Sequence, residues 1–226
     1  MSDMVQVKIC GVTRLADALA ATEAGADMIG LNFYSGSPRY ITPESATALC
    51  AALRDAAGAD TPRLIGVFVN EPVSRISAIM GQVGLSGAQL HGDESRDMLK
   101  ELRGTAFKAI QPPDVNAALD DLTYYAPTFP PESAGLPAVL VDAYHPRLRG
   151  GTGETISAEI GLAVGERVPR YMLAGGLNAH NVAERVRGLR PWGVDTASGV
   201  ESGTAGVKDH DKIRAFVAAA KNAAGD

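Results

Sequence analysis

Short apolar runs alternate with longer, alanine-rich amphipathic stretches along the whole chain. The runs have the length and β-branched content of buried strands, and the stretches between them repeat apolar residues at helical spacing. We therefore predict strands at residues 5–10, 27–33, 63–69, 86–92, 106–111, 137–144, 170–176 and 192–199. Helices are predicted at residues 13–26, 42–58, 72–84, 94–104, 114–126, 157–166, 178–188 and 208–223.

The strict alternation of these elements predicts the fold class. Eight strand–helix units in 226 residues favour an α/β chain that forms a single TIM barrel, a closed (β/α)₈ barrel with parallel strands spanning 1–226 as one domain. An open doubly wound sheet is the structural alternative. Thr42 is the expected N-cap of its helix, with Pro43 at the first position and Glu44 in the first turn. Residues 127–137 are predicted to form a long loop on the N-terminal face, away from the chemistry.

Alternation within each strand predicts which polar side chains enter the barrel. Side chains of one phase meet the helices and those of the other phase point inside. The inward set comprises Lys8, Cys10, Gln89, His91, Asp142 and Asp195. Cys10, His91 and Asp142 also take the last inward position of their strands, at the rim where barrel active sites lie. Interior polar groups are costly without a partner or a ligand, so this set predicts a functional site.

Glycine-rich turns follow the last two predicted strands. AGGLN (174–178) and ASGVES (197–202) stand where many barrels bind phosphate, because glycine lets backbone N–H groups approach the oxygens near a helix N-terminus. The alternative is that both are ordinary tight turns. A third such segment, RGGTGET (149–155), is expected to cap the pocket or to serve only as a loop.

Composition narrows the classes of partner. The net charge is −5 and no basic run is long enough for nucleic acid or a membrane surface, but a small anionic substrate fits. No secretory segment and no run of about 18 apolar residues is present, so a cytoplasmic location is expected. The two cysteines, Cys10 and Cys50, are therefore expected as thiols. The four histidines lack ligand spacing, so no metal site is expected, and a monomer and a homodimer both remain open.

Several short motifs occur in a fixed order over almost the whole chain. They are KICGVT (8–13), SPRYI (37–41), GVFVN (66–70), QLHGDE (89–94), VDAY (141–144), GGTG (150–153), LAGGLN (173–178), DTASGVE (195–201) and a GxKD pattern (206–209). As an ordered set they resemble the phosphoribosylanthranilate isomerases of tryptophan biosynthesis. The chain departs from that pattern at Glu154, where lysine is common, and in the length of 127–137.

The resemblance implies a cofactor-free barrel enzyme acting on a small phosphosugar. Its reaction is the Amadori rearrangement of N-(5-phosphoribosyl)anthranilate to 1-(2-carboxyphenylamino)-1-deoxyribulose 5-phosphate. Carried over by motif, Cys10 is the general base, Asp142 the general acid and Arg39 the ligand of the anthranilate carboxylate. The expected phosphate ligands are Gly175, Gly176, Ser198, Gly199 and Val200, and the other expected substrate contacts are Lys8, Gln89, His91 and Asp195.

The rearrangement needs two proton transfers, one from an acid and one to a base, and these residue types can perform them. An acid protonates the furanose oxygen to open the ring, and a base then removes the proton from C2. A thiolate can be the base if its pKa falls from about 8.5, and Lys8 lies about 6–7 Å away along the strand. Asp142 must hold a proton, which burial or a substrate anion would favour.

Other interpretations remain at this point. A metal-dependent epimerase would need convergent histidine and aspartate ligands, and the histidine-pathway isomerase would have aspartate at the position of Cys10. A catalytically silent phosphate-binding barrel would lack the acid or the base. Individually, Cys10 could be core filler, Arg39 a surface ion pair, and Gln89 and His91 interior packing.

Overall fold

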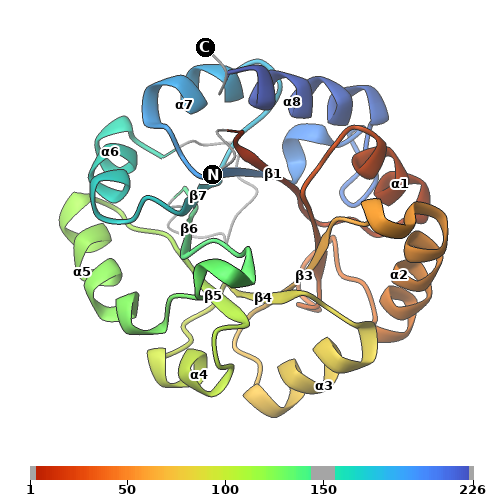
Figure 1. Cartoon of the computed structure of the whole chain (residues 1–226), viewed down its shortest axis with the longest axis horizontal. Helices are drawn as coiled ribbons and strands as arrows, with labels where there is room; N and C mark the ends of the chain where they lie inside the picture. The colour runs from red at the N-terminus through yellow and green to blue at the C-terminus, as the bar shows by residue number, and fades with distance from the viewer. Residues whose placement is uncertain (1–3, 144–155, 224–226) are drawn as a thin grey trace.

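The chain folds into a closed barrel of parallel strands inside a ring of helices (Figure 1). The computed structural model describes residues 4–143 and 156–223. The strands are β1 (Gln6–Ile9), β2 (Met28–Asn32), β3 (Arg63–Phe68), β4 (Gly87–Leu90), β5 (Ala106–Ile110), β6 (Val139–Val141), β7 (Tyr171–Leu173) and β8 (Gly193–Thr196). Pairing of β1 with β8 closes the sheet, so the predicted (β/α)₈ barrel is confirmed and the open sheet is excluded.

One helix follows each strand. The helices are α1 (Leu15–Glu23), α2 (Pro43–Ala57), α3 (Val73–Val83), α4 (Arg96–Glu101), α5 (Val115–Tyr125), α6 (Ala158–Arg167), α7 (Val182–Leu189) and α8 (His210–Ala223). The predicted start of α2 is confirmed, because the Thr42 side chain accepts a hydrogen bond from the Ser45 N–H and Pro43 opens the helix. Within the described residues, no helix has the length and apolar character needed to cross a bilayer.

Two apolar layers hold the barrel together. The larger one lies between strands and helices, and the smaller one fills the barrel interior with side chains that include Met28, Ile65, Phe107, Leu140 and Met172. Burial of each large apolar side chain contributes about 1.5–3 kcal/mol. Because Asp142 lies two residues beyond Leu140 on the same face of β6, the polar interior set rests on this apolar floor.

The irregular segment 127–137 lies between α5 and β6, as predicted, and contains the short turns η2 (Ala126–Thr128) and η3 (Glu132–Ala134). The Arg170 guanidinium ties it to the start of β7: Nη1 donates to the Leu136 carbonyl at 2.7 Å and Nη2 donates to that of Pro130. The segment therefore belongs to the N-terminal face of the barrel, opposite the rim where the catalytic residues are expected.

The last three strands each end three residues earlier than predicted, β6 at 141 rather than 144. β7 stops at residue 173 rather than 176, because Gly175 and Gly176 adopt left-handed backbone with φ of +84° and +58°. β8 stops at 196 rather than 199 and leads into the 3₁₀ turn η4 (Ser198–Val200). α7 begins at residue 182 rather than 178, because the Asn178 N–H donates to the Asn181 side chain at 2.9 Å and forms a turn instead.

Candidate active site

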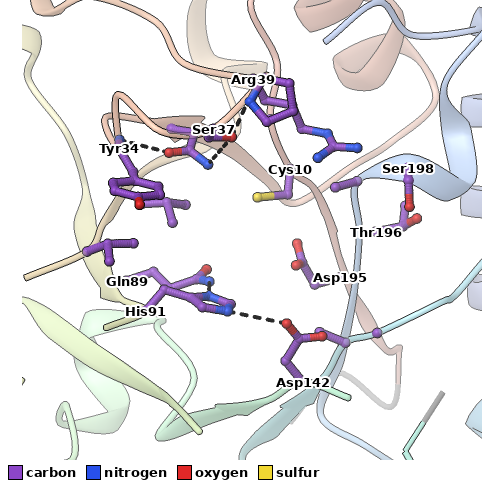
Figure 2. Close-up of a pocket in the computed structure, with 18 of the residues that line it drawn as sticks. Cys10, Tyr34, Ser37, Arg39, Gln89, His91, Asp142, Asp195, Thr196 and Ser198 are labelled. Carbon is purple, nitrogen blue, oxygen red and sulfur yellow. Dashed lines mark hydrogen bonds and ion pairs between the residues drawn. The ribbon is translucent and has the colours of Figure 1, made fainter. Parts of the chain in front are cut away.

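A pocket of about 440 Å³ opens at the C-terminal ends of the strands (Figure 2). Its volume lies within the range of about 300–1,000 Å³ usual for small-molecule sites. The sequence-predicted residues that line it are Cys10, Arg39, Gln89, His91, Asp142, Gly175, Gly176, Asp195 and Ser198. The inward phase predicted for the strand residues is therefore confirmed, and Cys10 and Asp142 face this pocket from β1 and β6.

Cys10 stands directly after β1 with only 9% of its surface exposed. Gly30 on β2 makes room for it, because a Cβ at that position would lie 2.8 Å from the Cys10 sulfur. Burial raises the pKa of the Cys10 thiol above its ordinary value. The Lys8 ammonium is the largest opposing influence, so the predicted direction of its effect is right, but burial outweighs it.

Lys8 does not line the pocket, in contrast to its predicted place among the substrate contacts. Its side chain is fully buried beneath the pocket, where Nζ donates to Asp195 Oδ1 and Gln89 Oε1, each at 2.9 Å. Burial by itself would lower the pKa of Lys8, but Asp195 and Cys10 outweigh it and the pKa is raised. Lys8 is therefore a charged group that supports the pocket floor.

Asp142 stands directly after β6 and is 5% exposed. Its Oδ1 accepts the Ala143 N–H at 2.9 Å, and its Oδ2 accepts from Gln111 Nε2 at 3.2 Å. His91 Nε2 lies 3.3 Å from the same Oδ2, at ion-pair distance but without the alignment of a hydrogen bond. The other ring nitrogen, Nδ1, contacts Gln89 Nε2 at 2.8 Å. The carboxyl group thus accepts from two N–H groups, lies beside the His91 ring and faces the pocket.

Arg39 is already half of an ion pair. Its Nε and Nη2 donate to the two carboxylate oxygens of Glu201 at 2.7 and 2.8 Å. Glu201 Oε1 also accepts the Gly206 N–H at 2.8 Å and lies 3.3 Å from Lys208 Nζ. Burial would raise the pKa of Glu201, but these donors, Arg39 first, hold it below its ordinary value. The ion pair joins the loops after β2 and β8 and fixes the guanidinium at the edge of the pocket.

The two glycine-rich turns meet at one side of the pocket. Gly175, Gly176 and Ser198 line it, whereas Gly199 and Val200 are not among its lining residues. A Cβ at Gly199 would lie 2.0 Å from the Leu177 carbonyl oxygen, so this glycine allows the two turns to pack. The Val200 side chain is fully buried in the layer between strands and helices. Only backbone atoms of these two residues remain as candidate ligands.

Sequence reasoning missed the pocket-lining side chains of Asn32, Tyr34, Ser37 and Thr196. It also missed three residues that contact the predicted groups from outside the lining. Gln111 follows β5 in the inward phase, a signal that could have found it. Glu201 and Lys208 lie inside motifs that carried the resemblance, but nothing in their spacing indicated an ion pair with Arg39. The predicted capping loop at 149–155, which includes Gly150–Glu154, lies outside the described residues.

Both cysteines are free thiols, and Cys50, on the buried face of α2, packs in the hydrophobic core as expected. In the part of the chain that the structure describes, no group of three or more His, Cys, Asp or Glu side chains is arranged to hold a metal ion. The functional groups that line this pocket are one thiol, carboxyl groups, an imidazole, amides, several hydroxyl groups and the guanidinium of Arg39.

The family model and the curated relatives that match this chain name the same family. The family described as N-(5'-phosphoribosyl)anthranilate (PRA) isomerase matches residues 7–219. The chain is 46% identical over 225 residues to the N-(5'-phosphoribosyl)anthranilate isomerase of Roseiflexus sp. (strain RS-1), covering 98% of this chain and 100% of that protein.

Solved structures give the same result. One is described as mutually generated monomers of the dimeric phosphoribosylanthranilate isomerase from Thermotoga maritima, with TM-score 0.80, 34% identity and coverage of 97% of this chain and 100% of that one. Another is a phosphoribosylanthranilate isomerase in complex with reduced 1-(o-carboxyphenylamino)-1-deoxyribulose 5-phosphate, with TM-score 0.80, 33% identity and coverage of 97% and 100%. This chain belongs to the N-(5'-phosphoribosyl)anthranilate isomerase family.

Proposed function

We propose that this protein isomerises N-(5-phosphoribosyl)anthranilate to 1-(2-carboxyphenylamino)-1-deoxyribulose 5-phosphate by general acid–base catalysis in tryptophan biosynthesis. The observation that carries the proposal is the arrangement of Cys10 and Asp142, which face one pocket from β1 and β6. The family match supports the substrate and the product.

Asp142 is the general acid in this proposal. A protonated Asp142 gives its proton to the furanose ring oxygen, and the ring opens to a Schiff base between the sugar and the anthranilate nitrogen. The N–H groups of Ala143 and Gln111 then stabilise the carboxylate that remains, because both already donate to its oxygens.

Cys10 is the general base. Its thiolate removes the proton from C2 of the sugar, and the resulting enolamine tautomerises to the ketone. Because the pKa of the buried thiol is raised, the thiolate is a minor species near neutral pH but a correspondingly strong base. The positive charges of Lys8 and Lys208 lower the cost of forming it.

Two anchors hold the substrate between these groups. Phosphate binds at the glycine turns, where Gly175, Gly176 and Ser198 line the pocket and backbone N–H groups can approach its oxygens. The anthranilate carboxylate binds Arg39, whose Nη1 is not used in the pair with Glu201. The anchors place C2 and the ring oxygen between Cys10 and Asp142.

Turnover of N-(5-phosphoribosyl)anthranilate, followed by the fluorescence of its anthranilate ring, tests the proposal. Cys10→Ala and Asp142→Ala should each lower kcat by about 10²–10⁴-fold. The matched controls are Cys50→Ala in the core of α2 and Asp55→Ala on its exposed face, and both should keep the wild-type kcat. Activity that survives Cys10→Ala would contradict the assignment of the base, and absent wild-type turnover would contradict the proposed function.

The same proposal covers assembly and location. The protein acts in the cytoplasm as a monomer or a homodimer, without a cofactor, nucleic acid or membrane as partner. A related structure is described as mutually generated monomers of the dimeric enzyme from Thermotoga maritima, and the dimeric state of that relative supports the dimer. Light scattering of the purified chain distinguishes the two states.

A further inference from the structure

A chain of polar contacts starts beneath the pocket, continues through residues that line it and ends at the proposed acid. It begins at Lys8 Nζ on β1, which donates to Gln89 Oε1 on β4 at 2.9 Å. Gln89 Nε2 contacts His91 Nδ1 at 2.8 Å, and His91 Nε2 lies 3.3 Å from Asp142 Oδ2 (Figure 2). The question is where the proton of the imidazole ring lies.

The ammonium group fixes the direction of the amide. A lysine side chain has three donors and no acceptor, so the atom of Gln89 that faces it must be the carbonyl oxygen. Lys8 itself cannot turn away, because it is fully buried and its Nζ also donates to Asp195 at 2.9 Å. The NH₂ group of Gln89 therefore faces His91.

The amide then fixes the imidazole. An NH₂ group only donates, so His91 Nδ1 must accept and carries no proton. In a neutral ring the proton then lies on Nε2, the atom that faces Asp142. A second proton on Nδ1 would direct two donors at each other across 2.8 Å.

We propose that Lys8 and Gln89 are positioning residues that hold His91 as the neutral Nε2–H tautomer. This inference rests on the proposed function, in which Asp142 is the general acid. In this tautomer, His91 leaves the catalytic proton on Asp142. An imidazole is ordinarily a stronger base than a carboxylate and would take that proton. Its one free basic site, Nδ1, is blocked by the Gln89 amide, so the proton of Asp142 goes to the substrate instead.

The tautomer can be measured directly on the full-length protein without substrate. Long-range proton–nitrogen NMR of uniformly ¹⁵N-labelled protein at neutral pH gives both ring nitrogen shifts, and the His91 signals are identified by their loss in His91→Asn. We expect a pyridine-type Nδ1 and a pyrrole-type Nε2. A protonated Nδ1, either as the other tautomer or as imidazolium, would overturn the proposal. Because this spectrum needs no turnover, it is independent of the proposed function.

Gln89→Glu tests the cause of the tautomer. The new carboxylate has nearly the same shape and still accepts from Lys8, but it can only accept from His91, so Nδ1 should become protonated. We expect kcat to fall about tenfold, part of the contribution of a general acid. KM should change less than about twofold, since the substrate anchors are untouched.

The matched control is Gln82→Glu on the exposed face of α3, which makes the same chemical change at a residue that does not line the pocket. It should keep both the His91 spectrum and the wild-type kcat. A Gln89→Glu protein that is folded but keeps an unprotonated Nδ1 and wild-type kcat would refute the role of Gln89. If Gln89→Glu does not fold, the wild-type spectrum still decides the tautomer.

Discussion

The two sides of the pocket, around Cys10 and around Asp142, differ in the charge of the groups that surround each residue. Around Cys10 the protein places the ammonium groups of Lys8 and Lys208, and both lower the pKa of the thiol. Each ammonium is itself paired with a carboxylate, Lys8 with Asp195 at 2.9 Å and Lys208 with Glu201 at 3.3 Å. The thiol therefore stands at the edge of two buried ion pairs.

Around Asp142 the contacts that orient the carboxyl group come from neutral donors. The Ala143 N–H and the Gln111 amide donate to its oxygens, and His91 lies 3.3 Å away. Hydrogen bonds from neutral donors are weaker than those from a full positive charge, but they still fix the orientation of the group.

The difference agrees with the starting charge that each proposed role requires. A buried base must become an anion before it acts, and nearby cations reduce the desolvation cost of that anion. An acid must begin neutral, and a cation at its side would remove its proton.

Removing either of the two proposed reacting groups with little change in shape should have the largest effect. Cys10→Ser and Asp142→Asn should each lower kcat by about 10²–10⁴-fold, because a hydroxyl is a poor base and an amide is a poor acid. The kcat of the double variant should be only slightly lower than that of the less active single variant, because the effects of removing groups that act in one reaction are not additive. Single-turnover rates measure this, and two effects that multiply fully would show that the groups act independently.

The charge around the thiol should set the pH dependence of its reactivity. Because the pKa of Cys10 is raised, its alkylation by iodoacetamide should be slow at neutral pH and rise tenfold per pH unit up to a plateau above pH ~8.5. Mass spectrometry separates this reaction from that of Cys50, which is fully buried.

The double variant Lys8→Met, Asp195→Asn removes the buried ion pair without leaving one charge alone. The plateau should move to higher pH, because the lowering of the Cys10 pKa by Lys8 exceeds the rise caused by Asp195. A plateau that moves to lower pH would reverse the role assigned to the cations.

The smallest effect should come from the arginine anchor. Glu201→Gln removes the carboxylate that holds the Arg39 guanidinium, so KM should rise about three- to tenfold while kcat changes less. Glu71→Gln is the matched control, since it breaks an exposed ion pair with Arg75 and should leave both constants unchanged. A fall in kcat alone after Glu201→Gln would place Glu201 in the chemical step instead.

Period-two alternation was enough to predict the inward direction of Cys10, Gln89, His91, Asp142 and Asp195. That prediction works because strand geometry is local and the same in every barrel. The ends of β7 and β8 were predicted less well, because left-handed glycines and asparagine side-chain turns end these elements before the apolar pattern does. Boundaries depend on single backbone conformations that the pattern of apolar residues does not encode.

The alternation of strands and helices, the face of each strand residue and the family motifs could all be read from the amino-acid order. The folded chain was needed to show that Lys8 lies beneath the pocket instead of lining it, and that Arg39 is paired with a residue 162 positions away. It also decided the contacts that run from Lys8 through Gln89 to His91. The physical reason is that partners and burial depend on side chains from different strands meeting in one interior, and barrel closure alone brings them together.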